Sequence, residues 1–211
     1  MIEILFLVNL IPIIIYGSIY VISNKYRKID NKKQLSGFEV AKKILDKYDI
    51  DVYIVEGKNI NYNIYDNDTK SIKFSKKDFH GEDLTSLVFS AIESIHIILY
   101  NEGNKLIKFR NALMKTIELL TYFAYVVLLY GLCVNAYNII TFGLVILLVI
   151  LLFHLFTYSI EKESKERTLD ELLKNKLISS SEKEDVIKLL KAYSLNYLAS
   201  IVTCLFKLFN F

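Results

Sequence analysis

Residues 117–158 read IELLTYFAYVVLLYGLCVNAYNIITFGLVILLVILLFHLFTY, and this stretch decides the class of the protein. It contains two apolar blocks, 117–134 and 139–158. Each block is close to the ~20 residues that a helix needs to cross the hydrocarbon core of a bilayer. Only the uncharged residues 135–138 separate the blocks, so the two helices must run antiparallel. The stretch therefore predicts a transmembrane helical hairpin.

Two further apolar blocks lie at the ends of the chain, at 2–23 and 193–211. The first is too long for the core of a secretory signal and is followed by bulky residues, so we interpret it as an uncleaved anchor. The last block is weaker because it contains Asn196, Ser200 and Lys207, although a lysine can extend its ammonium group to the membrane surface. We therefore expect about four transmembrane helices.

The composition of the chain agrees with a multi-span membrane protein. The 211 residues are 53% hydrophobic and 23% charged, and the charges fill the spaces between the apolar blocks. A soluble domain mixes the two residue types instead. The net charge of +3 is too small and too dispersed for a nucleic-acid-binding protein. Cys133 and Cys204 each lie inside an apolar block, so we expect buried thiols rather than a disulfide or a metal motif.

The positions of the basic residues predict the orientation of the chain. Lysine and arginine gather on the cytoplasmic side of membrane proteins, and here they flank every loop except the hairpin tip at 135–138. We therefore expect the N-terminus outside and residues 24–116 and 159–192 in the cytoplasm. The residues concerned are Lys25, Arg27, Lys28, Lys32, Lys33, Lys105, Lys108, Arg110, Lys115, Lys162, Lys165 and Arg167.

The segment 24–116 predicts a small cytoplasmic α+β domain. Ser36 and Glu39 form a capping box that begins a helix ending near residue 48. Residues 51–55 are typical of a strand, and 61–65 and 71–75 of a hairpin across the polar turn 66–69. The helix expected at 83–100 is apolar nearly all round, so it is buried in protein or lies against the membrane.

The predicted fold is thus an α+β integral membrane protein with about four transmembrane helices. Residues 159–192 are expected to be mostly helical, with a second capping box at Ser181 and Glu184 that begins a helix running into the last block. The expected divisions are an anchor at 1–23, the cytoplasmic domain at 24–116, the hairpin at 117–158, a cytoplasmic helical segment at 159–192 and a last membrane helix at 193–211.

Glu93 and His96 are two polar residues on the otherwise apolar helix predicted at 83–100. Their spacing of three places them on one face of a helix. An ionised carboxylate in apolar surroundings is costly, so the two side chains could simply satisfy one another. The alternative is the remnant of a metal site, because metallopeptidase helices carry H-E-x-x-H, in which two histidines bind zinc. Ile92 stands where the first histidine of that motif should be.

A series of short motifs follows the N-terminal block in order. They are SGFEVAKKIL at 36–45, YD at 65–66, FS at 74–75, HG at 80–81, SAIESIH at 90–96, NEG at 101–103, IEKES at 160–164 and LKAYSLNY at 190–197. In order and spacing they are similar to the motifs of the bacterial neutral zinc metallopeptidase family of membrane proteins, the YugP type. The resemblance covers nearly the whole chain.

The resemblance implies roles for four residues. Glu93 stands at the position of the general base, which activates the zinc-bound water, and His96 at that of the second zinc histidine. Glu161 stands at the position of the third zinc ligand. Glu163 stands where the family has an aspartate that could support the ligands through hydrogen bonds.

Two departures from the family pattern bear on the expected zinc site. Ile92 replaces the first zinc histidine and cannot coordinate a metal, and Ile95 replaces a glycine and adds bulk. A catalytic zinc ion normally has three protein ligands and one open position. We therefore expect zinc to be absent or weakly bound at this degenerate H-E-x-x-H motif.

His80 and His154 are the remaining histidines that could replace the missing ligand. His80 precedes the helix expected at 83–100, and we interpret it either as a solvated loop residue or as a substitute ligand. His154 lies seven residues before Glu161, about 10 Å away along a continuous helix. We therefore interpret His154 as a packing residue of the hairpin.

The leading hypothesis from the sequence is a catalytically inactive member of the family that acts as a binding scaffold. Its expected partners are membrane lipid and membrane-protein clients, the latter bound along the sheet edge at 61–75. The alternative is an active zinc-dependent membrane peptidase with a non-standard ligand set. A third possibility, a superficial similarity, would be favoured if Glu93, His96 and Glu161 did not converge.

Overall fold

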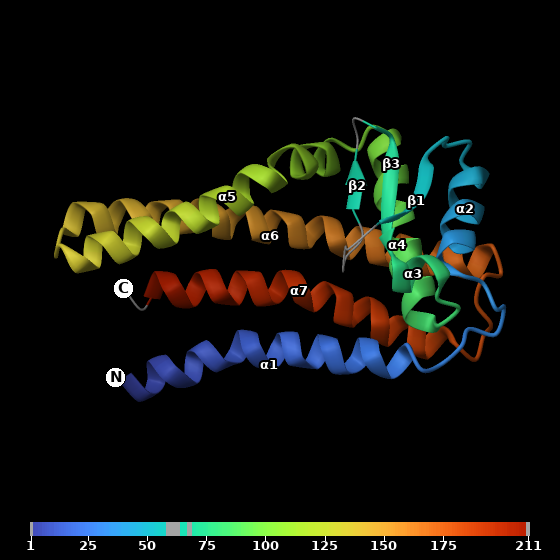
Figure 1. The fold of residues 1–211 in the computed structure, drawn as a ribbon, viewed down its shortest axis with the longest axis horizontal. Coiled ribbons are helices and arrows are strands. Elements are labelled where there is room, and N and C mark those ends of the chain that lie inside the picture. The colour runs from blue at the N-terminus through green and yellow to red at the C-terminus, as the bar shows by residue number, and fades with distance from the viewer. Residues whose placement is uncertain (1, 58–63, 67–68, 210–211) are drawn as a thin grey trace. The chain divides into compact units, whose positions relative to one another are not determined.

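The computed structural model describes residues 2–57, 64–66 and 69–209 (Figure 1). The side chains of 2–12, 64, 66, 196–198, 200 and 203–209 lie outside this description. The chain is mostly helical, and it divides into two compact units. We call Met1–Ile19, Lys108–Glu161 and Ser194–Phe211 the hairpin unit, and Tyr20–Ile107 and Lys162–Tyr193 the sheet unit.

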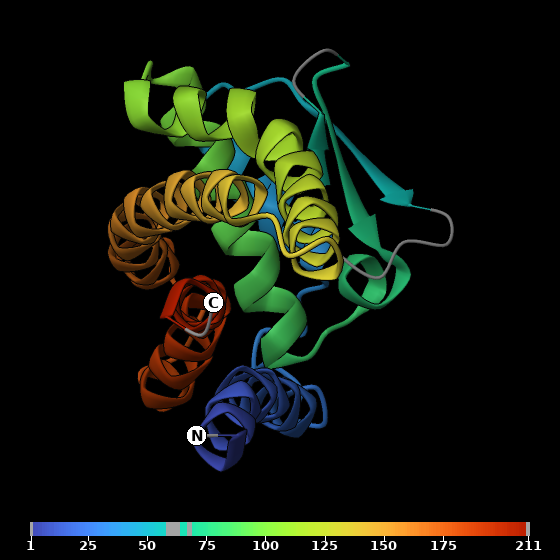
Figure 2. The same ribbon diagram turned by 90° about the vertical axis from the view of Figure 1, so that its left-hand side faces the viewer.

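Two long helices form the centre of the hairpin unit, α5 (Lys105–Cys133) and α6 (Tyr137–Lys174). Figures 1 and 2 show them side by side, joined by a tight turn, so the helical hairpin expected at 117–158 is confirmed. Asn135 in this turn has a φ of 51°, in the left-handed region that asparagine tolerates better than most residues.

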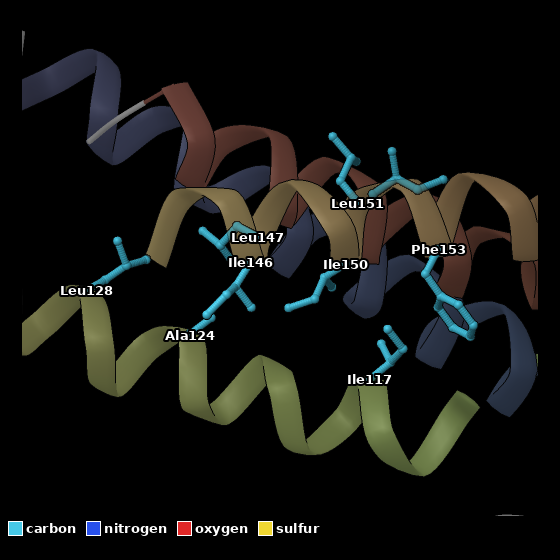
Figure 3. Close-up of a cluster of buried hydrophobic side chains, with 9 residues drawn as sticks. Ile117, Ala124, Leu128, Ile146, Leu147, Ile150, Leu151 and Phe153 are labelled. Atoms are coloured by element: carbon cyan, nitrogen blue, oxygen red, sulfur yellow. The ribbon is translucent and has the colours of Figure 1, made fainter. Parts of the chain in front are cut away.

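A cluster of buried apolar side chains holds α5 against α6, as Figure 3 shows. Apolar side chains on the outer faces are exposed, for example Leu119 at 70% and Val126 at 65%. An apolar exterior around a packed apolar interior is what a bilayer-spanning hairpin requires. The buried cluster consists of Ile117, Ala124, Leu128, Ile146, Leu147, Ile150, Leu151, Phe153 and Ile201.

Two glycines allow the helices of the hairpin to approach closely. A Cβ atom at Gly143 would lie 2.7 Å from the Leu128 side chain, and one at Gly131 would lie 3.0 Å from the backbone nitrogen of Ile140. Both distances are shorter than ordinary contacts, so a larger residue would push the helices apart. Small residues serve the same purpose in many membrane helix pairs.

The two terminal blocks are also helical, as α1 (Ile2–Tyr26) and α7 (Lys183–Phe209). Among the described residues, three helices are long and apolar enough to cross a membrane: α5, α6 and α4 (Leu84–Asn101). Most of α4 is buried in protein, which confirms one of its two predicted environments. Membrane crossing by α1 and α7 remains a prediction.

The sheet unit contains three strands in the order β1-β3-β2, with β3 in the centre (Figure 1). The strands are β1 (Tyr53–Gly57), β2 (Ile64–Asp66) and β3 (Ser71–Ser75). Antiparallel pairing of β2 with β3 confirms the predicted hairpin for the residues described, while 61–63 and 67–68 lie outside the description. The strand expected at 51–55 begins two residues later, at Tyr53, and runs parallel to β3.

Helix α2 (Gly37–Lys47) begins at the predicted capping box of Ser36 and Glu39 and buries one apolar face. Val40, Ile44 and Leu45 are each at most 1% exposed. Gly37 is required at the start of α2, because a Cβ atom there would lie 2.1 Å from the backbone oxygen of Asp78. The short helix α3 (Lys76–His80) thus lies directly against the N-terminus of α2.

The turn between α6 and α7 corrects one expectation. Glu182, rather than Glu184, reaches back along the chain, and it accepts a hydrogen bond from the backbone N–H of Ser179 at 2.7 Å. Its other oxygen accepts from the backbone N–H of Lys32 at 2.8 Å. The capping box expected at Ser181 and Glu184 is therefore wrong. The carboxylate that accepts the backbone hydrogen bonds at this turn belongs to Glu182, and it joins two segments of the sheet unit.

Candidate functional site

Helix α4 carries Glu93 and His96, the two polar residues that the sequence predicts on one helix face. Its N-terminus is capped by Asp83, whose carboxylate accepts from the N–H of Ser86. Nδ1 of His96 and Oε2 of Glu93 lie 3.6 Å apart, with side-chain exposures of 6% and 16%. This separation exceeds that of a hydrogen bond and the ~3 Å that a direct His96–Glu93 bond would require. The two side chains therefore form a local electrostatic pair.

Tyr193 is a partner of Glu93 that the sequence did not reveal. Its hydroxyl donates a hydrogen bond to Oε1 of Glu93 at 2.8 Å. The Tyr193 ring packs edge-on against Phe89, with the ring centroids 5.4 Å apart. Tyr193 belongs to α7, a hundred residues further along the chain, and no local spacing rule connects it with α4.

Ile92 and Ile95 are both buried in the sheet unit, at 1% and 0% exposure. Neither side chain carries a lone pair, so neither can bind a cation. The position that the family resemblance assigns to the first zinc ligand is therefore occupied by a packed hydrocarbon side chain.

Glu161 lies in the hairpin unit and has a cationic partner there. Nη1 of Arg110 on α5 lies 2.6 Å from Oε1 of Glu161 on α6, and the two side chains are 7% and 1% exposed. Such a charge-assisted hydrogen bond is short and strong. In the sequence Arg110 indicates only the orientation of the chain, but it and Glu161 lie about equally far from the hairpin tip. Antiparallel register could therefore have predicted their contact.

Glu163 occupies an exposed position on α6. Residues two apart on a helix are turned by about 200°, so Glu163 faces away from the side that carries Glu161. Its expected support of the ligands remains a prediction.

The other two histidines have neighbours of their own. Nε2 of His80 lies 2.8 Å from Oε2 of Glu56, and both side chains are well exposed. His154 lies in the hairpin unit, with its ring centroid 6.0 Å from that of Phe153. Since α6 is continuous from Tyr137 to Lys174, His154 and Glu161 are about 10 Å apart along its axis.

A hollow of about 570 Å³ lies beside β1, where α2 ends. Phe38, Tyr53 and Ile54 provide apolar walls. Among the described strands β1 pairs only with β3, and Tyr53 N donates to the Lys70 carbonyl at 2.9 Å. Backbone groups alternate in direction along a strand, so those of Ile54 and Glu56 face the open edge. The charged lining residues are Lys42, Asp46, Asp49 and Asp51.

Comparison with known proteins identifies the family. A family model described as "Putative neutral zinc metallopeptidase" matches residues 1–211. The chain belongs to this family. The resemblance found in the sequence motifs is therefore confirmed, and the matched residues include α4 and α6, which carry Glu93, His96 and Glu161.

A curated relative from the neutral zinc metallopeptidase family is described as "Putative membrane protease YugP" of Bacillus subtilis (strain 168). It is 24% identical over 190 residues, which cover 89% of this chain and 84% of the relative. Together with the three apolar helices, this relative supports a membrane location. No solved structure matches the chain.

The residues at the family's ligand positions do not fit a catalytic zinc ion. Within the described ranges, no three histidine, cysteine, aspartate or glutamate side chains gather as one metal-binding group. Ile92 cannot serve as a ligand, and Arg110 already contacts Glu161. His96 and Glu161 belong to different units, so their expected convergence remains a prediction.

Proposed function

We propose that this chain is a degenerate neutral zinc metallopeptidase, a membrane-bound scaffold that no longer cleaves peptides. The observation that carries the proposal is Ile92, a fully packed isoleucine at the position of the first zinc histidine. A zinc ion that lost one of its three protein ligands would be weakly held and poorly oriented, and even the loss of a group supporting a ligand typically costs about 10–100-fold in affinity.

The partners of the two acidic positions support the same proposal. Glu93 accepts a hydrogen bond from Tyr193, and Glu161 pairs with Arg110. Buried carboxylates need such partners, because an unpaired buried charge is strongly destabilising. Both carboxylates are therefore stabilised by the chain itself, without a metal ion.

A scaffold needs a binding surface, and the open edge of β1 supplies one. The hairpin 61–75 offers only β2 as an edge, because β3 lies in the centre of the sheet. Strand β1 borders the hollow beside α2. An extended segment of a client can add to such an edge as a further strand.

The charges around the hollow indicate the chemistry of the client. Three aspartates and one lysine line it, although the whole chain is net positive. The cytoplasmic segments next to membrane spans are rich in lysine and arginine. We therefore propose that the client is an extended, basic segment that flanks a transmembrane helix of another membrane protein.

The decisive experiment is zinc analysis of the detergent-purified protein. We expect substoichiometric zinc and no proteolysis from the unaltered chain, and a higher zinc content from Ile92→His. Ile98→His is the matched control, because Ile98 is an equally buried isoleucine of α4 outside the motif. Tight one-to-one zinc together with peptide cleavage by the unaltered chain would establish the alternative, an active peptidase with a non-standard ligand set.

A further inference from the structure

Both carboxylate oxygens of Glu93 face groups of the sheet unit. The hydroxyl of Tyr193 donates to Oε1 at 2.8 Å, and the His96 ring lies 3.6 Å from Oε2. A general base acts through a carboxylate oxygen that lies within hydrogen-bond reach of the proton it removes. Here the oxygen with the short contact is already bonded to a phenol.

The Tyr193 ring is held in place independently of this hydrogen bond. Phe89 precedes Glu93 by one helical turn on α4, and its ring contacts that of Tyr193 edge-on. Residues four apart lie on the same face of a helix, so the aromatic contact directs the phenol hydroxyl toward Glu93. The ring contact and the hydrogen bond thus reinforce one another.

We propose that Tyr193 is a positioning residue that blocks the access of water to the Glu93 carboxylate. Its hydroxyl occupies Oε1 of Glu93, one of the two oxygens at which a reactive water could bind, and the His96 ring lies beside the other. This inference rests on the proposed function, because it takes Glu93 to be the family's general-base position. It adds a second obstacle to catalysis, independent of the ligand lost at Ile92.

Carboxyl labelling can test whether Tyr193 blocks access to the Glu93 carboxylate. Dicyclohexylcarbodiimide enters apolar surroundings and reacts with accessible carboxyl groups, and mass spectrometry locates the modified residue. Tyr193→Phe removes the hydroxyl and keeps the ring that packs on Phe89. We expect the labelling rate of Glu93 to rise about 10–100-fold, which is the range that a hydrogen bond to a charged group typically contributes.

Tyr26→Phe is the matched control. The Tyr26 hydroxyl also donates to a carboxylate of the sheet unit, Oδ1 of Asp185, at 2.9 Å. Its removal should leave Glu93 labelling unchanged. Glu171, which is buried in the same unit, serves as an internal reference, because its labelling rises if a variant unfolds.

The outcomes separate this inference from the proposed function. Equal labelling of Glu93 in the unaltered protein and in Tyr193→Phe, with Glu171 unchanged, would overturn the role of Tyr193. If Glu171 labelling also rises in Tyr193→Phe, the ratio of Glu93 to Glu171 labelling decides, and an unchanged ratio likewise rejects the role. Failure of the proposed function would be seen instead as stoichiometric zinc and peptide cleavage by the unaltered chain.

Discussion

Glu161, which the motif resemblance assigns to a zinc-ligand position, forms a buried ion pair with Arg110. The desolvation of two charges is costly, and it is offset only when each charge keeps its partner. The glutamate can therefore remain in the chain as a structural residue.

Removal of Arg110 should destabilise the hairpin unit. Arg110→Ala removes the cationic partner 2.6 Å from the buried Glu161 carboxylate, and we expect a loss of about 3–5 kcal/mol in the free energy of unfolding. Thermal unfolding of the detergent-solubilised protein, followed by circular dichroism, measures the effect.

The double variant Arg110→Met with Glu161→Leu is the matched control, because it removes both charges and keeps the volume. It should recover most of the stability lost by Arg110→Ala. A single variant as stable as the unaltered protein would contradict a structural role for the pair.

Glu171 predicts how the stability of the sheet unit depends on pH. Burial raises the pKa of Glu171, but hydrogen bonds from Lys47, Tyr48 and Asn175 outweigh it and lower the pKa below its usual value near 4.5. A carboxylate with a lowered folded-state pKa stabilises the fold above its unfolded-state pKa. This stabilisation is lost as the pH falls through the folded-state value.

Denaturant unfolding at pH 7 and at successively lower pH should therefore show a loss of stability on the acid side of pH 4.5. Glu171→Gln should reduce this dependence, because the amide does not titrate. Glu163→Gln, an exposed change on the same helix, should keep the acid dependence of the unaltered protein. The same slope in all three proteins would exclude Glu171 as a source of acid sensitivity.

At the residue scale, the sequence predicted that Glu93 and His96 share one face of a helix, and the structure places their side chains 3.6 Å apart. Their roles at a metal site and the loss of a ligand at Ile92 remain predictions. Spacing along one helix is a local property, and the i, i+3 rule was sufficient. Tyr193 could not be predicted in the same way, because its contact with Glu93 depends on how α7 packs against α4. Side-chain partners from distant helices require the tertiary structure.

At the element scale, strand β1 carries the proposed binding edge. Its backbone N–H groups face the open edge and β3 in turn, so proline at two neighbouring positions tests binding and folding separately. The N–H of Ile54 faces the open edge, whereas that of Val55 faces β3. Proline lacks an N–H, and it is tolerated in an edge strand only where that group faces outward. Ile54→Pro should therefore weaken binding of a basic, extended peptide and leave the fold intact.

Val55→Pro is the counterpart of this change, because it removes a hydrogen bond to β3 and should destabilise the sheet itself. Fluorescence anisotropy with a labelled lysine- and valine-rich peptide measures binding, and circular dichroism measures folding. Unchanged binding in a folded Ile54→Pro variant would show that β1 is not the docking edge. Asp49→Lys should weaken the same binding by reversing one charge of the hollow.

At the element scale, the predictions succeeded where a local signal was strong. The capping box at Ser36 predicted the start of α2, and the apolar blocks predicted the hairpin parts of α5 and α6. Both helices extend beyond these blocks, α5 from Lys105 and α6 to Lys174. The start of β1 was misplaced by two residues because the polar residues before Tyr53 carry no clear boundary signal. The parallel pairing of β1 with β3 has no signature in the local sequence, and it depends on the packing of α2 and α3.

At the scale of the whole molecule, the orientation in the membrane can be tested with single cysteines. In a background without Cys133 and Cys204, a cysteine introduced as Asn138→Cys at the hairpin tip should react with a membrane-impermeant thiol reagent in intact cells. One introduced as Lys70→Cys should not react, because we expect the sheet unit to lie in the cytoplasm.

Permeabilised cells provide the control for this labelling, since both cysteines should react once the membrane is open. Labelling of Lys70→Cys but not of Asn138→Cys in intact cells would invert the proposed orientation. Labelling of both positions would contradict a hairpin that separates two compartments.

The division into two units follows from the distribution of apolar residues, which the sequence displays directly. The interleaving of the units along the chain is less evident. The sheet unit is completed by residues 162–193, which follow the whole hairpin. Contacts between such distant segments, such as Lys32 with Glu182, depend on the fold and not on any local pattern.

This interleaving has a consequence for biosynthesis. Helix α4 is apolar and long enough to be taken for a membrane span, yet its partner Tyr193 is translated a hundred residues later. At ordinary elongation rates Tyr193 is synthesised about 5–20 s after the nascent helix α4. During this interval an acidic residue near the middle of α4 opposes insertion by the translocon, at roughly 2.5–3.5 kcal/mol for a central charge. We therefore expect Glu93 to help keep α4 out of the bilayer, a task that requires neither zinc nor catalysis.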